Sequence, residues 1–329
     1  MKNELKPGNV VFSDLHPSGG DKRSEILSGL QKKQKSIDPK YFYDARGSVL
    51  FENITTLPEY YPTRTERQIL KQDAKAMAKL CGENCVLIEP GSGSSEKVRL
   101  LLDALKPAAY VPMDISSDFL KHSATQLAEE YPWLNVHAVC TDFAKQEKEP
   151  EGIEQGKRVI FYPGSTLGNM KPDDATQFLA KLGQWVGQDG GVLIGIDMHK
   201  STRILEDAYN DQQGITALFN LNILSNINAL TGSNFDTNHF SHRAFYNEEK
   251  FRIEMHLVSE IDQVVNLCGS NISFTRGETI HTENSYKYTR ESFQKIATRA
   301  GFVIKSSWSD DQQLFGVHYL GRIRESASG

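Results

Sequence analysis

The sequence has no long hydrophobic run and no excess of basic charge. None of its apolar stretches approaches the ~20 residues that a membrane-spanning helix needs, and its first residues lack the apolar core of a secretion signal. A formal net charge of -5 gives no reason to expect nucleic acid or an anionic membrane as a partner. We expect a cytoplasmic protein, and a monomer, that works on a small-molecule substrate.

Cysteine is scarce, and histidines do not cluster. The four cysteines are scattered, at Cys81, Cys85, Cys140 and Cys268. The first two are close together, but no second pair or histidine cluster at zinc spacing accompanies them. We therefore expect four reduced thiols and no metal site.

A glycine-rich turn follows a short apolar run near residue 90. The run Val86 to Ile88 predicts a buried strand, and Pro90, Gly91 and Gly93 predict a turn that leads into a helix. Such a strand, turn and helix form a cradle for a nucleotide-like ligand. The third glycine of the dinucleotide fingerprint is missing, so a tight turn without a ligand is the alternative.

Strands alternate with helices of about a dozen residues along 65–199, which predicts a doubly wound, mostly parallel Rossmann-like α/β sheet. Right-handed crossovers bring the carboxyl ends of these strands to one edge. An acid or a glycine loop follows four strands, at Glu89 to Gly91, Asp114, Asp142 and 164–169. One such acid is more often a helix cap, but four in succession favour a single binding crevice.

The rest of the chain breaks this alternation. Residues 65–199 and 288–329, which end in a strand hairpin, are predicted to form a methyltransferase-type domain that binds S-adenosylmethionine. Residues 1–64 and 200–287 are predicted to form a second, smaller α+β domain for the acceptor substrate. Its expected elements are a helix over 24–33, an extended stretch over 59–61 before a helix from residue 65, a single strand over 245–258 and a polar loop over 279–288.

Nicotinamide oxidoreductases and methyltransferases both combine a glycine turn with an acid on the second strand. Three features favour a methyltransferase: Glu89 directly before the turn, the pair Asp142-Phe143 after the third strand, and the terminal hairpin. A non-catalytic sensor of S-adenosylmethionine is a third alternative. None of these features identifies the methyl acceptor.

The sequence resembles the histidine-specific methyltransferases of ergothioneine biosynthesis, which trimethylate the α-amine of histidine to hercynine with S-adenosylmethionine. The resemblance covers the chain from about Ser24 to Leu320. Its marks are the segments 41–44 (YFYD), 57–64 (LPEYYPTR), 91–97 (GSGSSEK), 163–169 (PGSTLGN), 208–211 (AYND) and 252–255 (RIEM).

The resemblance implies roles for twelve residues. The predicted contacts of S-adenosylmethionine are Gly91, Lys97, Asp114, Asp142 and Phe143. The predicted contacts of the acceptor's carboxylate and amine are Tyr60, Asn169 and Tyr209. Tyr43 is expected near the amine, and Tyr43 and Asn169 would orient its lone pair for in-line attack on the sulfonium methyl.

The same resemblance implies that Glu283 and Ser285 bind the imidazole and that Met255 packs against it. An imidazole offers donor or acceptor nitrogens according to its tautomer, which suits a carboxylate beside a hydroxyl. Asn284 stands where the family leads us to expect a small apolar residue, and its side chain should point away. A solvated loop acid is the alternative for Glu283, and a relative that methylates tryptophan would carry an apolar residue there.

Overall fold

The computed structural model describes residues 9–15, 22–146 and 148–323, and it divides into two compact units. Unit 1 holds the described residues before Ser18 together with Thr65–Met198 and the chain from Tyr288 onward. Unit 2 holds the described part of Gly19–Arg64 and His199–Lys287. Among the described residues, no helix is both long and apolar enough to cross a membrane.

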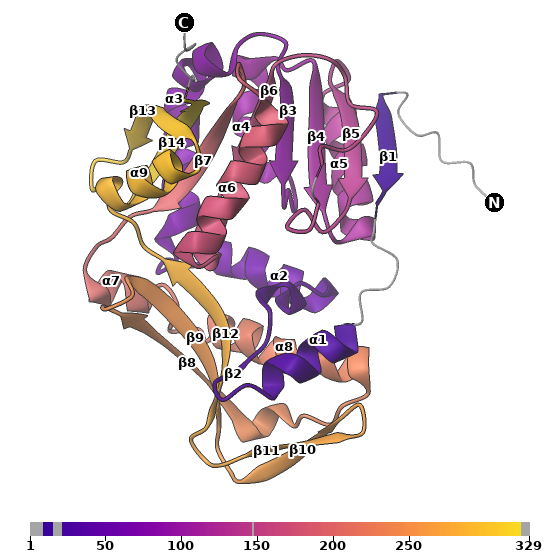
Figure 1. Ribbon diagram of the computed structural model, residues 1–329, viewed down its shortest axis with the longest axis vertical. Coiled ribbons are helices and arrows are strands. Elements are labelled where there is room, and N and C mark those ends of the chain that lie inside the picture. Colours follow the sequence, from indigo (N-terminus) through magenta and orange to yellow (C-terminus); the bar gives the residue numbers. More distant parts are fainter. Residues whose placement is uncertain (1–8, 16–21, 147, 324–329) are drawn as a thin grey trace, which may run out of the picture. The chain divides into compact units, whose positions relative to one another are not determined.

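Unit 1 is built on an eight-stranded sheet in the order β1-β5-β4-β3-β6-β7-β14-β13 (Figure 1). The strands from β1 to β7 in this order are parallel, whereas β14 runs antiparallel to both of its neighbours. Their bounds are β1 Val10–Asp14, β3 Val86–Pro90, β4 Ala109–Asp114, β5 Asn135–Cys140, β6 Arg158–Tyr162, β7 Gly191–Asp197, β13 Phe302–Ser309 and β14 Phe315–Arg322.

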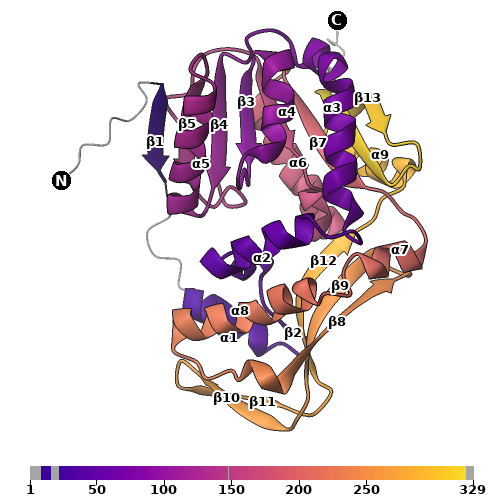
Figure 2. The same ribbon diagram turned by 180° about the vertical axis from the view of Figure 1, so that it is seen from behind.

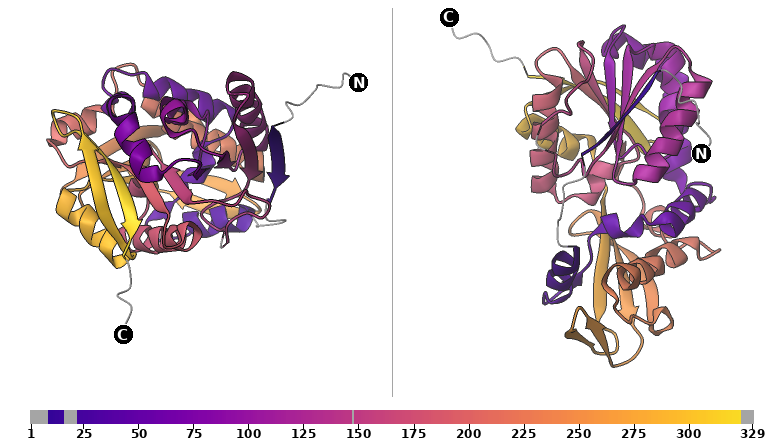
Figure 3. Two further views of the ribbon diagram at one scale, coloured as in Figure 1. Left: turned by 90° about the horizontal axis from the view of Figure 1, so that it is seen from above. Right: turned by 90° about the vertical axis from the view of Figure 1, so that its right-hand side faces the viewer.

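Helices cover both faces of this sheet, because its central strands are apolar on both sides. Helices α3, α4 and α5 lie on one face, and α6 and α9 lie on the other (Figures 1 and 2). Seen from its β1 edge, the sheet stands between these two helical layers (Figure 3, right). The helix bounds are α3 Tyr61–Cys81, α4 Glu96–Leu105, α5 Ser117–Glu130, η2 Thr166–Asn169, α6 Pro172–Val186 and α9 Arg290–Arg299.

Unit 2 combines a four-stranded sheet in the order β2-β12-β9-β8, a two-stranded ribbon β10-β11 and several helices. Helix α8 packs against β8 and β9 and also contacts α2 and α1. The bounds are α1 Lys22–Leu30, β2 Lys35–Ser36, η1 Pro39–Phe42, α2 Ala45–Thr55, α7 Thr202–Asp207, α8 Ile215–Thr231, η3 Thr237–His239, β8 Phe240–Asn247, β9 Arg252–Ser259, β10 Gln263–Leu267, β11 Ser270–Phe274 and β12 Thr279–Tyr286.

The doubly wound sheet and its terminal hairpin confirm the predicted fold class, but several local predictions were wrong. Val10–Asp14, which we placed in the second domain, pairs with β5 as an edge strand of the large sheet. The stretch 245–258 is a hairpin of two strands rather than one strand. Helix α3 begins at Tyr61 instead of residue 65, because proline is tolerated in the first turn of a helix.

The stretch 279–288, predicted as a polar loop, is mostly strand β12, which pairs with β9. Its polar residues concealed it because they interrupt the alternation of apolar and polar residues that predicts a half-buried strand. The backbone hydrogen bonds to β9 supply what the local sequence does not. This correction matters because the predicted imidazole contacts lie on this strand.

Candidate active site

The glycine turn of unit 1 has the backbone conformation that the sequence predicted. Gly91 and Gly93 have positive φ angles of 70° and 51°, where other residues are disfavoured. A Cβ atom on Gly91 would lie 3.3 Å from the ring of Phe143. The turn after β3 and the aromatic residue after β5 are therefore neighbours, as the shared edge of the sheet requires.

Asp114 lies at the carboxyl end of β4, beside this turn. Its carboxylate accepts hydrogen bonds from the backbone N–H groups of Gly93 at 3.1 Å and Ser116 at 2.9 Å. Burial raises the pKa of Asp114, and these two hydrogen bonds oppose the increase. The structure thus brings Gly91, Phe143 and Asp114 together at the edge where a ribose-bearing ligand would bind.

Asp142 and Phe143 follow β5. The carboxylate of Asp142 lies 3.6 Å from the ammonium of Lys145. The ring of Phe143 makes edge contacts with Tyr162 and Phe178, and its carbonyl accepts a hydrogen bond from Lys181 at 2.9 Å. Packing therefore fixes the aromatic ring that was predicted to contact S-adenosylmethionine.

Lys97, in the first turn of α4, pairs with a carboxylate that the sequence analysis did not single out. Its ammonium lies 2.6 Å from Glu66, which is fully buried. Both carboxylate oxygens of Glu66 also lie 2.9 Å from the N–H of Gly164, in the loop that ends at Asn169. One carboxylate thus connects two of the predicted ligand-binding segments of unit 1.

The sequence contains a signal that could have identified Glu66. It precedes the buried residues Ile69 and Leu70 by three and four positions, so it lies on the apolar face of α3. A charged residue on such a face requires a partner. The pattern does not show that the partner is Lys97, because that contact spans 31 residues of sequence.

Glu89, at the end of β3, is fully buried beneath the glycine turn. It accepts a hydrogen bond from the hydroxyl of Tyr110 on β4, and Tyr110 also lies 3.1 Å from Ser95. Burial raises the pKa of Glu89 to about 8, against the opposing effects of Tyr110 and Lys97. At neutral pH this carboxyl is therefore largely protonated.

In unit 2 a register shift in β12 decides which residues share a face. His281 is opposite His256 of β9, but after the shift Glu283 is opposite Met255 and Ser285 is opposite Ile253. Opposed residues in a sheet lie on the same face. The shift therefore brings Glu283 and Met255, both predicted to contact the imidazole, onto one face.

Asn284 lies on the opposite face, which is the orientation that the sequence analysis expected. It is opposite Glu254 across the strand pair.

Burial raises the pKa of Glu283 to about 7, and Lys287 opposes the increase. The carboxyl of Glu283 thus lies close to its titration midpoint at neutral pH.

Asn220 of α8 holds the shifted strand in place. Its amide nitrogen donates to the carbonyl of His256 at 3.0 Å, and its amide oxygen accepts from the hydroxyl of Thr282 at 2.8 Å. Asn220 is fully buried. The sequence analysis did not single it out, although a buried asparagine requires such partners.

Ser285 lies within hydrogen-bond distance of two polar side chains. The hydroxyl of Tyr209 is 2.8 Å from its Oγ, and the ammonium of Lys287 is 2.7 Å from it. The rings of Tyr60 and Tyr209 meet edge to face, with centroids 6.2 Å apart. Unit 2 thus brings together Tyr60, Tyr209 and Ser285, three predicted acceptor contacts, and adds Lys287, which the sequence analysis missed.

Tyr43 has different neighbours. Its ring contacts the rings of Phe51 and Phe219, at centroid distances of 5.8 and 5.9 Å, and its side chain is partly exposed. Asn169 belongs to unit 1, where it ends the short helix η2. The catalytic roles of Tyr43 and Asn169 stay predictions.

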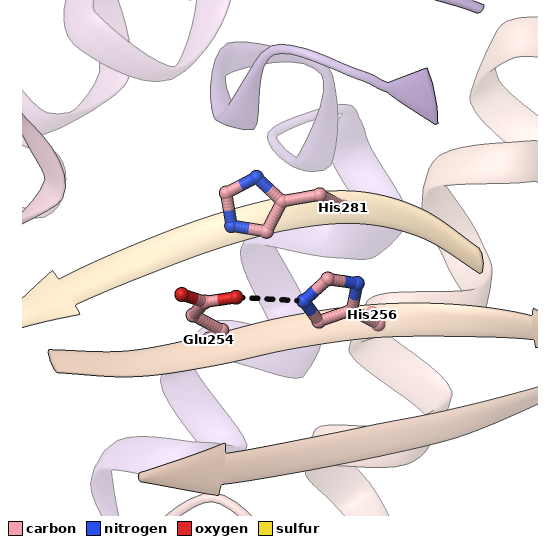
Figure 4. A group of neighbouring side chains, drawn as sticks. All are labelled: Glu254, His256 and His281. Carbon is pink, nitrogen blue, oxygen red and sulfur yellow. Dashed lines mark hydrogen bonds and ion pairs between the residues drawn. The ribbon is translucent and has the colours of Figure 1, made fainter. Parts of the chain in front are cut away.

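Among the described residues, Glu254, His256 and His281 are of types that could hold a metal ion, with donor atoms within 4.8 Å of one another (Figure 4). They lie on the face of the sheet opposite Glu283. Both oxygens of Glu254, both ring nitrogens of His256 and Nε2 of His281 already bond to protein groups. Nε2 of His256 lies 3.1 Å from Glu254, and His281 donates to the carbonyl of Glu283 at 3.1 Å.

The guanidinium of Arg252 balances the charge of this group, since it donates to Glu254 at 2.6 and 2.9 Å. Burial raises the pKa of Glu254, but the bonds from Arg252 and His256 outweigh it and hold the pKa at about 2. Burial and the neighbouring His256 lower the pKa of His281 to about 4. The group is a charge-balanced network of one ion pair and two neutral imidazoles.

The strand order of unit 1, with β14 antiparallel between β7 and β13 and a glycine turn after β3, defines the class of S-adenosylmethionine-dependent methyltransferases. Within this class, the family model described as histidine-specific methyltransferase, SAM-dependent, matches residues 22–322. The chain belongs to that family. This assignment excludes the nicotinamide oxidoreductase alternative.

Named relatives span nearly the whole chain. Histidine N-alpha-methyltransferases from Mycolicibacterium smegmatis and Mycobacterium tuberculosis are 37% and 39% identical, and each alignment covers 90% of this chain and 93% of the relative. An L-tryptophan methyltransferase from Psilocybe serbica is 28% identical, with 88% of this chain and 90% of the relative covered. The chain is thus similar to enzymes with different methyl acceptors.

Proposed function

We propose that this protein transfers methyl groups from S-adenosylmethionine to the α-amine of L-histidine, three times in succession, and so forms hercynine for ergothioneine biosynthesis. The observation that carries the choice of histidine is the pairing of Glu283 with Met255 on one face of the unit 2 sheet, next to the Ser285 and Tyr209 pair. An indole has a single ring nitrogen, an N–H, so it could not match both the carboxylate of Glu283 and the hydroxyl of Ser285. The histidine N-alpha-methyltransferases at 37% and 39% identity support the same choice.

The residues of unit 1 would hold the methyl donor. Asp114, at the end of β4, would accept hydrogen bonds from the ribose hydroxyls, and Phe143 would lie against the adenine. Asp142 would bind the adenine amino group, and Gly91 and Lys97 would contact the rest of the cofactor. The sulfonium methyl is already activated, so the protein contributes mainly proximity and orientation.

The acceptor contacts would be Tyr60, Asn169 and Tyr209 for the carboxylate and amine, with Glu283 and Ser285 for the imidazole. The unprotonated amine would attack the sulfonium methyl in line, its N–C bond forming as the C–S bond breaks and S-adenosylhomocysteine leaves. The methylated nitrogen would lose a proton before the second and before the third transfer. Tyr43 and Asn169 would orient the amine lone pair at each round. As methyl groups accumulate, tyrosine faces would stabilise the quaternary cation.

Methyl transfer from a sulfonium requires no metal ion, so we propose that the enzyme works without one. We also propose a cytoplasmic monomer. Size-exclusion chromatography with light scattering tests whether the protein is a monomer. Assays with and without a chelator test whether the enzyme needs a metal ion. An activity that the chelator abolishes and zinc restores would contradict the proposal.

Mass spectrometry of the purified protein, incubated with S-adenosylmethionine and each common amino acid in turn, tests the acceptor. We expect α-N-trimethylhistidine from histidine and no product from the other amino acids. Methylation of tryptophan in preference to histidine would support the alternative acceptor. Binding of S-adenosylmethionine without turnover of any amino acid would support the sensor alternative.

A further inference from the structure

Lys287 is a buried cation beside the predicted imidazole contacts. Lys287 is 3% exposed, and its Nζ lies 2.7 Å from Oγ of Ser285 and 3.3 Å from the hydroxyl of Tyr209. The ammonium also lies over the ring of Tyr209, 5.1 Å from its centroid. Lys287 directly follows the last residue of β12, and its 2.7 Å contact with Ser285 places its ammonium beside that hydroxyl.

The arrangement constrains where the proton of Ser285 can point. An ammonium can only donate hydrogen bonds, so Lys287 donates to Ser285. The phenol of Tyr209, 2.8 Å away, also donates to Ser285. Because a phenol has one proton, Tyr209 would then contact the acceptor by accepting a hydrogen bond from its amine. A serine hydroxyl has two lone pairs and one proton. With both lone pairs in use, Ser285 must give its own proton to a third group.

We propose that Lys287 makes Ser285 an obligatory hydrogen-bond donor, so that the site selects an acceptor side chain with a ring nitrogen that carries a lone pair. This inference rests on the proposed function. A neutral imidazole fits, since its lone-pair nitrogen accepts from Ser285 while its N–H donates to the carboxylate of Glu283. Lys287 is thus a positioning residue that acts on the substrate through Ser285.

The proposal predicts discrimination between ring analogues. Thienylalanine has no ring nitrogen, whereas the 4-thiazolyl and 5-thiazolyl alanines each have one lone-pair nitrogen and no N–H. All three leave Glu283 without its N–H partner, so this loss cancels when they are compared. We expect one thiazole isomer to have a kcat/KM at least about 10-fold above that of thienylalanine. Thienylalanine leaves the hydroxyl of Ser285 without an acceptor, and an unpaired polar group in a site carries a cost of this size.

The experiment measures kcat/KM for histidine and the three analogues with the wild-type enzyme and with Lys287→Met, at saturating S-adenosylmethionine. Without the ammonium, the proton of Ser285 can turn to Tyr209. We expect the thiazole-to-thienyl ratio to fall to within about threefold of unity, whereas a purely structural loss would lower all rates alike. Lys287→Arg keeps an obligatory donor and should retain the ratio.

Ser285→Ala should remove the same discrimination, and it serves as the second variant if Lys287→Met does not fold. Circular dichroism and S-adenosylmethionine binding check the fold of each variant. An unchanged ratio in folded Lys287→Met, or a wild-type enzyme that does not distinguish thiazole from thiophene, would overturn the inference. Failure of the wild-type enzyme to methylate histidine would instead overturn the proposed function.

Discussion

Replacement of Glu66 by glutamine removes the buried negative charge that connects Lys97 to the loop at Gly164. Loss of one partner of a buried ion pair costs about 3–5 kcal/mol. The side chain of Lys97 is 20% exposed, and water can therefore solvate part of its charge. We discount the cost to roughly 2–3 kcal/mol, because solvent screens partly exposed pairs.

Thermal unfolding followed by circular dichroism measures this effect. For a unit of roughly 200 residues, 1 kcal/mol corresponds to about 2–4 °C, so Glu66→Gln should lower the Tm by about 4–12 °C. Calorimetric titration should also show weaker binding of S-adenosylmethionine, because both Lys97 and the loop at Gly164 lose a common anchor.

The matched control is Glu96→Gln. The side chain of Glu96 is 53% exposed, and its carboxylate lies 3.7 Å from Arg99 and 3.9 Å from Arg67. A surface pair of this kind contributes little, so we expect a change within about 0.5 kcal/mol. If Glu66→Gln unfolds at the same temperature as this control and binds S-adenosylmethionine as the wild type does, the assigned role of Glu66 is wrong.

Three further predictions concern acceptor choice, product distribution and pH. Glu283→Ala should lower kcat/KM for histidine by about 100-fold or more, because the ring N–H loses its acceptor, and tryptophan turnover should rise relative to it; equal losses for both amino acids would contradict the assignment. Tyr43→Phe should change the ratio of mono-, di- and trimethylated histidine by mass spectrometry, and an unchanged profile would exclude this role. The pKa of Glu89, about 8, exceeds the ordinary glutamate value, so its stabilising contribution is complete below about pH 4.5 and is lost as the pH rises towards 8. The free energy of unfolding of the wild type, measured with denaturant, should therefore fall by up to about 1.4 kcal/mol per pH unit relative to that of Glu89→Gln across that window. Parallel pH curves for the two proteins would refute the raised pKa.

Much of unit 1 was predictable because its patterns are local. A buried apolar run, a turn with glycines at positive φ and an amphipathic helix each depend on residues close in sequence. Gly91 and Asp114 were located by this reasoning alone, since parallel strands end at one edge. Unit 2 was predicted less well because β12 is polar and its pairing with β9 is not encoded in its own periodicity.

The sequence by itself determined the parallel sheet, the glycine turn, the terminal hairpin and the resemblance to histidine-specific methyltransferases. Only the tertiary structure decided that a register shift places Glu283 with Met255, that Lys287 and Tyr209 converge on Ser285, and that Glu66 holds Lys97. The physical reason is the range of the interactions. Periodicity and turn chemistry act over a few residues, whereas the contact of Tyr209 with Ser285 joins groups 76 positions apart, and its geometry exists only after strands and helices have packed.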